Sequence, residues 1–286
     1  MSKLSNSLFI IVLIFSSSSA QTDDIDRFIQ AKMSERNIPG LQLAVIRNNQ
    51  IIKLGSYGIA NIEDSIPVDA QTVFAINSMT KIFTGVAVMQ LVEAGKIKLE
   101  DPISTAIDSL PPDWQATTIE QLLTHTSGLP DMMDYNAKIT ATWEEAQKLP
   151  RLNEVDTEFR YNQLNYVLIG RLISKLSGMS FQDFIIKQQL NAVNAERTIE
   201  AGFGHYQNVI PHSARGYTYF ITGKLTHVYE EFPPEFQTAA GMGTTATELV
   251  NWLIALQNGK LIKKENLKTL WQAARLKNGQ TKGFGR

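Results

Sequence analysis

The sequence predicts a mixed α/β fold of the α+β type, with an antiparallel sheet near the N-terminus and helices after it. Two apolar, β-branched runs, Leu41 to Ile46 and Ile51 to Tyr57, are separated by Asn48-Asn49-Gln50, which is typical of a hairpin. An apolar helix pattern then ends at Gly95, and residues 100–192 are expected to be mostly helical. This division predicts a sheet-bearing part and a helical part.

The composition fits a globular protein of one or two domains. Of the 286 residues, 43% are hydrophobic and 19% are charged, and no long polar or repetitive tract interrupts them. The formal net charge is −1, so nothing predicts a nucleic acid or an anionic membrane surface as a partner. The chain has no cysteine, which excludes disulfides, thiol chemistry and thiolate metal sites.

The first 20 residues are typical of a secretory signal peptide. Lys3 supplies a positive charge, Leu8 to Phe15 is an apolar run, and four serines lead to cleavage after Ala20. The apolar run is too short to span a bilayer. We therefore expect a secreted or periplasmic protein without a stable membrane span, whose mature domain covers residues 21–286. The alternative is a buried N-terminal strand.

One helix is predicted before the hairpin and one after it. Residues 24–37 carry apolar side chains at helical spacing and end before Pro39. After the hairpin, apolar residues again recur three to four apart and end at Gly95, where a left-handed helix cap is expected. Asn77 and Ser78 suit the first turn of this second helix. Its apolar face is predicted from Ile82, Val86, Met89 and Val92.

A serine and a lysine lie three residues apart at the start of that helix. Residues at this spacing are neighbours on a helix, so the amine of Lys81 can reach the hydroxyl of Ser78. The helix dipole and burial both favour the neutral lysine. A neutral amine can accept the serine proton, which is the Ser-Lys form of an activated nucleophile. The pattern occurs by chance about once in a chain of this length, so alone it leaves catalysis open.

Further helices are predicted from capping residues. Thr117 with Glu120, and Thr118 with Gln121, form two overlapping capping boxes. The other expected elements are a helix over residues 142–149, a helix that ends at Gly178, a helix capped by Ser180, a hairpin of residues 217–221 and 224–229, a helix capped by Thr245 that ends at Gln257, and a last helix over residues 264–274.

Four phrases in order resemble the penicillin-recognising serine hydrolases, and most closely the branch of class C β-lactamases with their esterase and peptidase relatives. Phe74 to Lys81 resembles the Ser-x-x-Lys motif, and Leu122 to Leu129 resembles Leu-Leu-x-His-Thr-Ser-Gly-Leu. Tyr161 to Gly170 resembles Tyr-x-Asn with its following helix, and Ala240 to Leu249 resembles Gly-Gly-Leu-x-Ser-Thr-x-x-Asp-Leu. Four matches in order are more specific than any one phrase.

The resemblance implies a β-lactamase/transpeptidase-like fold, in which helices flank an antiparallel sheet and a helical subdomain is added. Ser78 would be the nucleophile that forms an acyl-enzyme, Lys81 would tune it, and Tyr161 would be a base or proton shuttle. A nearby ammonium favours the ionised tyrosine, although Tyr161 could also be an ordinary half-buried aromatic residue. The implied substrate is a β-lactam, a small ester or a peptide, with no metal and no cofactor. The oligomeric state is left open.

Two departures from the family pattern concern the site. Gln163 stands where the family has an asparagine that contacts the substrate amide and the lysine, and it is longer by one methylene. The third motif, Lys-Thr-Gly or His-x-Gly, is not found, because Thr281-Lys-Gly-Phe-Gly has its residues in the wrong order. In the family, that late strand supplies an oxyanion-hole donor. The sequence is therefore expected to be C-terminally truncated and to lack late sheet strands.

Other functional classes find less support. His125 follows a predicted helix end, where it is expected to cap carbonyl groups rather than catalyse. The remaining histidines lack metal-ligand spacing, and no Gly-x-Ser-x-Gly elbow occurs. Two hypotheses stay open: a secreted serine hydrolase, or a non-catalytic or defective homologue that binds cell-wall peptide or a protein partner. Ser78, Lys81 and Tyr161 favour the first, whereas Gln163 and the absent third motif favour the second.

Overall fold

The structure is a computed structural model that describes residues 23–134, 139–140, 142–204, 209–219, 223–228, 234–281 and 285. The predicted signal peptide, residues 1–20, and most of the phrase after Thr281 lie outside these residues. The chain divides into two compact units between Ile38 and Pro39. In the first unit, helix α1 (Asp24–Glu35) begins with a capping box between Asp23 and Asp26, close to the predicted bounds.

The main sheet of the second unit has the order β1-β2-β3 and is antiparallel. Its strands are β1 (Gly40–Arg47), β2 (Gln50–Asn61) and β3 (Ile66–Pro67). Asn48 and Asn49 join β1 to β2 with φ angles of 51° and 60°, the left-handed conformation that a two-residue hairpin turn needs. The predicted hairpin is confirmed.

Short strand pairs connect distant parts of the chain. Strand β4 (Phe74–Ala75) pairs antiparallel with β9 (Gly243–Thr244), which brings the segment before Ser78 against residues 240–244. The other pairs are β5 (Met133–Asp134) with β6 (Ile139–Thr140), and β7 (Gly216–Thr218) with β8 (Thr226–Val228). The last pair confirms the predicted small hairpin, although its residues 220–222 and Tyr229 lie outside the described part of the chain.

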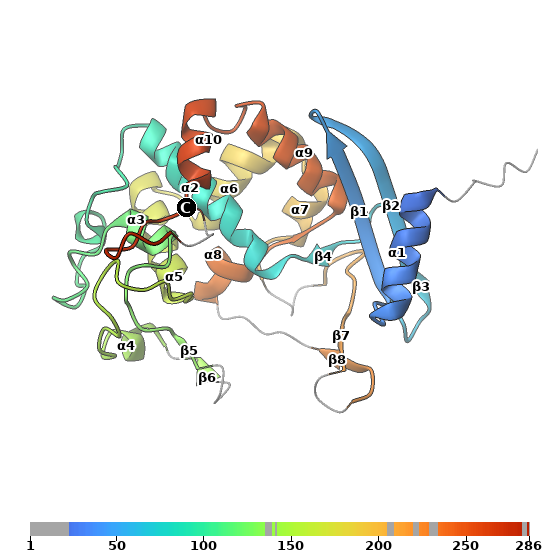
Figure 1. Ribbon diagram of the computed structural model, residues 1–286, viewed down its shortest axis with the longest axis horizontal. Helices are drawn as coiled ribbons and strands as arrows, with labels where there is room; N and C mark the ends of the chain where they lie inside the picture. The colour runs from blue at the N-terminus through green and yellow to red at the C-terminus, as the bar shows by residue number, and fades with distance from the viewer. Residues whose placement is uncertain are drawn as a thin grey trace, which may run out of the picture. The chain divides into compact units, whose positions relative to one another are not determined.

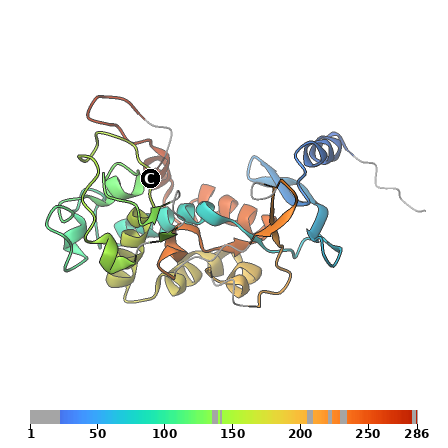
Figure 2. The same ribbon diagram turned by 90° about the horizontal axis from the view of Figure 1, so that it is seen from below.

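Helix α2 (Thr80–Glu93) lies among the other helices of the second unit (Figures 1 and 2). It contacts helices α5, α6, α8 and α10. Residues 83–89 are all buried, whereas Ile82 is 39% exposed. The sequence predicted a single apolar face that includes Ile82, and this was wrong in detail, because small and apolar residues let neighbours pack on nearly every side. Gly95 ends the helix with a φ angle of 67°, as predicted.

The second long helix of the core is α5 (Leu164–Ser177), which ends at Gly178 with a φ angle of 71°. The remaining α-helices in the described residues are α3 (Ile119–Leu123), α4 (Trp143–Ala146), α6 (Phe181–Ile185), α7 (Glu196–Ala201), α8 (Gln237–Ala240), α9 (Ala246–Gln257) and α10 (Lys264–Trp271). Ser180 and Thr245 cap α6 and α9, as predicted.

Two helix predictions differ from the structure. Of the two overlapping capping boxes, only that of Thr118 and Gln121 forms, because Thr118 is the N-cap residue of α3. The hydroxyl of Thr117 accepts a hydrogen bond from Arg151. Helix α4 ends at Ala146, three residues before the predicted end. Irregular chain therefore occupies much of the region between α3 and α5 that was expected to be helical.

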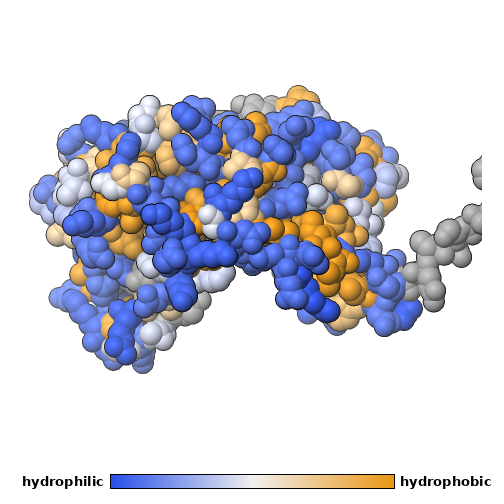
Figure 3. Space-filling view, turned by 90° about the horizontal axis from the view of Figure 1, so that it is seen from above, coloured by the Kyte–Doolittle hydropathy of each residue, from blue (hydrophilic) through white to orange (hydrophobic). Residues whose placement is uncertain are grey.

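Apolar side chains also reach the surface of the second unit. On β2, Ile51, Ile52 and Leu54 are between 37% and 48% exposed. Figure 3 shows hydrophobic patches among the hydrophilic surface on one face. Among the described residues, no helix has the length and apolar character needed to cross a membrane.

Candidate active site

Ser78 lies in a turn that leads directly into α2. A 3₁₀ turn (Asn77–Met79) follows β4, and the first residue of α2 comes immediately after it. The turn is held from the side of β9, because the N–H of Ile76 donates to the carbonyl of Met242 at 2.9 Å. The N–H of Met242 donates in turn to Thr80 Oγ1 at 3.1 Å. Ser78 is exposed, so its hydroxyl is presented to solvent at the end of a fixed helix.

Lys81 lies three residues after Ser78, in the first turn of α2, and is buried, with only 4% of the residue exposed. Its Nζ donates to Gln163 Oε1 and to the backbone carbonyl of Ala239, both at 2.9 Å. The ammonium also lies 4.8 Å from the ring centroid of Tyr161 and 5.1 Å from that of Tyr166. The structure thus brings Lys81 of α2 together with Tyr161 and Gln163, which lie in the segment that leads into α5.

The electrostatic surroundings of Lys81 lower its basicity. Burial lowers its pKa from 10.5 to about 7, and the carboxylate of Asp131 opposes this shift. Asp131 is affected in the opposite sense, because burial raises the pKa of its carboxyl group above the ordinary value. At neutral pH a substantial fraction of Lys81 is therefore the free amine. This agrees with the sequence argument, which expected burial to favour the neutral lysine.

Gln163 and Asp131 fix the start of α5 against the lysine. The N–H of Gln163 donates to Asp131 Oδ1 at 2.9 Å. Gln163 is only 6% exposed, and its side-chain oxygen faces Lys81. The extra methylene therefore does not prevent the contact with the lysine. A contact between Gln163 and a substrate stays a prediction.

His125 contacts the ring of Tyr161 and the backbone on either side of it. Its carbonyl accepts from the N–H of Arg160 at 2.8 Å, and its Nδ1 accepts from the N–H of Asn162 at 3.2 Å. The His125 ring lies 4.4 Å from the Tyr161 ring, centroid to centroid. The backbone of His125 is in the left-handed conformation, with a φ angle of 56°. His125 therefore holds the backbone on both sides of Tyr161 as well as its ring.

His125 is neutral at ordinary pH. Burial, with a smaller contribution from Lys81, lowers its pKa to about 3. Because Nδ1 accepts a hydrogen bond from a backbone N–H, the ring proton is assigned to Nε2. A neutral imidazole in a fixed tautomer fits a positioning role.

Sequence reasoning did not find three groups of this site. They are Asp131, the carbonyl of Ala239, and the contact of His125 with Tyr161. Asp131 follows the Leu122 to Leu129 phrase closely, and that proximity was the only available signal. A backbone carbonyl carries no side-chain signal, so only the fold could identify Ala239.

A sequence model of the beta-lactamase family, described as Beta-lactamase, matches residues 25–286. The chain belongs to the beta-lactamase family. The resemblance to this family is therefore confirmed, and the fold is the one that the family implies.

Curated relatives in the family are similar at low identity. Protein flp of Staphylococcus aureus strain N315 is 27% identical over 250 residues, which cover 80% of this chain and 47% of the relative. Penicillin-binding protein 4* of Bacillus subtilis strain 168 is 26% identical over 252 residues, which cover 80% of this chain and 55% of the relative. The chain thus spans about half the length of these relatives.

Solved structures show the same fold. The octameric penicillin-binding protein homologue from Pyrococcus abyssi superposes with a TM-score of 0.74 at 24% identity, over 92% of this chain and 64% of that one. A class C beta lactamase superposes with a TM-score of 0.72 at 23% identity, over 88% of this chain and 69% of that one.

Proposed function

We propose that this chain carries the catalytic core of a secreted serine hydrolase that cleaves an amide or ester through a Ser78 acyl-enzyme. The substrate class is a β-lactam, a small ester or a peptide. The main support is the position of Lys81, a buried lysine with a pKa of about 7 that lies one helical turn after an exposed serine. Family membership supports the same chemistry.

In the proposed reaction, the neutral amine of Lys81 accepts the proton of the Ser78 hydroxyl. The Ser78 oxygen then attacks the substrate carbonyl, and the tetrahedral intermediate collapses to an acyl-enzyme as the leaving group departs. Tyr161 lies against Lys81 and would carry the proton to the leaving group. Water then attacks the ester carbonyl of the acyl-enzyme and frees Ser78.

The contacts of Lys81 are compatible with the neutral amine that the first step needs. Its two hydrogen bonds hold Nζ towards Gln163 and Ala239. Both acceptors are neutral oxygens, so neither forms an ion pair that would keep the lysine charged. The carboxyl group of Asp131, which favours the charged lysine, is itself protonated more readily because it is buried.

The test is covalent labelling of Ser78. A fluorescent fluorophosphonate and a fluorescent penicillin are incubated with the full chain and with Ser78→Ala, and the labelled peptide is identified by mass spectrometry. We expect label on Ser78 with at least one reagent and none in the variant. Ser127 provides a matched control, because it is buried and its Oγ donates to Asn165, so it should never be labelled.

The second candidate is a non-catalytic homologue that binds cell-wall peptide or a protein partner. It is favoured by the observation that Lys81 Nζ donates to Gln163 and Ala239, whereas no hydrogen bond to Ser78 is found among the described residues. In that case neither reagent would label Ser78, although peptidoglycan fragments would still bind. Absence of label from a folded chain would overturn the hydrolase proposal.

A further inference from the structure

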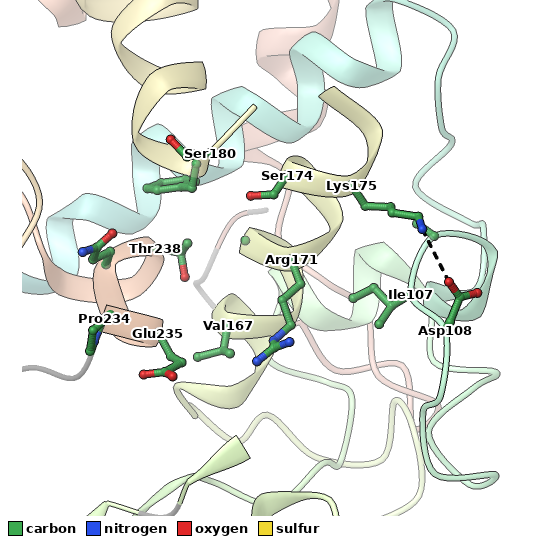
Figure 4. A pocket seen from close by; sticks show the side chains of 14 residues that line it. Ile107, Asp108, Val167, Arg171, Ser174, Lys175, Ser180, Pro234, Glu235 and Thr238 are labelled. Carbon is green, nitrogen blue, oxygen red and sulfur yellow. Dashed lines mark hydrogen bonds and ion pairs between the residues drawn. The ribbon is translucent and has the colours of Figure 1, made fainter. Parts of the chain in front are cut away.

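A cavity lies along α5, and neither Ser78 nor Lys81 lines it. Its volume is about 650 Å³, within the usual range for small-molecule sites. Val167, Gly170, Arg171 and Ser174 line it from α5, so positions three and four apart present one face of the helix. Figure 4 shows the side chains of Val167, Arg171 and Ser174, together with Ile107 and Thr238 from neighbouring segments.

The inner part of the cavity is apolar. Val167 and Phe181 are buried and line it, and Ile107 packs against the same core. Thr238 closes the wall beside Gly170, where a Cβ atom would lie 2.2 Å from Thr238 Cγ2. A ligand that fills the cavity must therefore carry an apolar group.

Arg171 provides the cavity with a positioned cation. Its guanidinium Cζ lies 4.0 Å from the ring centroid of Trp143, so one face of the planar group is covered. Among the described residues, no carboxylate lies within ion-pair distance of Arg171. The edge of the guanidinium keeps its N–H donors for a bidentate acceptor, and a carboxylate has the matching geometry.

The remaining charges limit the ligand to one negative charge. Lys175 is already paired with Asp108 at 3.5 Å, which Figure 4 shows at one edge of the cavity. The carboxyl groups of Asp108 and Glu235 both line the cavity and would repel a dianion. Of the two described cationic residues that line the cavity, Arg171 is therefore the one available to bind an anionic ligand.

We propose that this cavity binds a small monocarboxylate that carries an apolar group, with the carboxylate on Arg171 and the apolar group against Val167, Ile107 and Phe181. This site goes beyond the proposed hydrolysis, because none of Ser78, Lys81, Tyr161 and Gln163 lines it.

The experiment compares three probes of similar shape by titration calorimetry on the full chain. They are 3-phenylpropionate, its neutral amide, and phenethylamine. We expect the carboxylate to bind at least about tenfold more tightly than the amide, because a hydrogen bond to a charged group is worth more than one to a neutral group. The amine should not bind measurably.

Two variants test the position of the ligand. Arg171→Gln should raise the Kd for 3-phenylpropionate about tenfold or more, whereas Arg47→Gln, at an exposed arginine on β1, should leave it unchanged. Ser174→Phe keeps Arg171 and fills the cavity, so it should also abolish binding. Circular dichroism establishes that each variant is folded. Equal affinity for acid and amide, no effect of Arg171→Gln, or no binding of any probe would overturn the proposal.

Discussion

The helical core and the three-stranded sheet of the second unit differ in how completely they are buried. In α5, nine residues are buried, and ten are buried in α2. In β1 no residue is buried, and in β2 only Ala60 and Asn61 are. All the site residues described above come from the helical core and the loops attached to it. The site therefore depends on helix packing, and the described three-stranded sheet contributes little to its rigidity.

The largest expected effect comes from a cavity in the helical core. Leu168 of α5 is fully buried, so Leu168→Ala removes packed methyl groups and leaves a void. We expect a loss of about 2–5 kcal/mol in the free energy of unfolding. Urea denaturation followed by circular dichroism measures it. A loss below 1 kcal/mol would mean that the core is packed more loosely than its burial indicates.

The next effect concerns the support of Tyr161. His125→Ala removes both the ring contact and the Nδ1 acceptor, and misplacement by about 1 Å typically costs about 100-fold in rate. We expect the rate of Ser78 labelling to fall by about this factor. His125→Phe keeps a ring beside Tyr161 and should recover part of the rate. Equal labelling rates for the native chain and His125→Ala, with both folded, would show that His125 does not position Tyr161 for the reaction.

A change of pH is expected to have a smaller effect on the rate of Ser78 labelling. Because the pKa of Lys81 is about 7, the neutral amine increases about tenfold between pH 6 and pH 8, and the labelling rate should rise with it. The unfolded chain holds the Lys81 proton up to about 10.5, so between these two values it binds more protons than the folded chain. The contribution of Lys81 to stability therefore rises with pH from about 7 to about 10.5. A labelling rate that is flat from pH 6 to pH 8 would contradict the assignment.

The smallest effect is expected in the sheet. Leu54 of β2 is 48% exposed, and Leu54→Ala is the matched counterpart of Leu168→Ala. We expect a change within about 0.5 kcal/mol, as is usual for surface substitutions, in the same urea experiment. A loss similar to that of Leu168→Ala would abolish the contrast between sheet and core.

Much of the fold could be predicted from local signals. Asn48 and Asn49 between two β-branched runs specified the hairpin, and Gly95 and Gly178 marked two helix ends. These signals succeed because the left-handed conformation is costly for most residues. The lengths of the short helices were predicted less well, because a helix such as α4 has few intrahelical bonds and tertiary contacts decide where it ends.

The site could be predicted only in part. Ser78 and Lys81 are neighbours through helical spacing, so their proximity follows from the sequence. Tyr161 and Gln163 were assigned through the resemblance, and the structure places both against Lys81. Ala239 could not be found, since 158 residues separate it from Lys81 and its contribution is a main-chain oxygen.

The burial of α2 has a consequence for hydrogen exchange. Amide hydrogens in a helix that is packed on nearly every side exchange only when the whole unit unfolds, so those of residues 83–89 should be among the last to exchange in deuterated water. Ser78, at the solvent end of the same segment, is thus attached to backbone that opens very rarely. A reagent therefore reaches the Ser78 hydroxyl in the native state. The exchange rates of the amide hydrogens in residues 83–89 measure how often the unit unfolds.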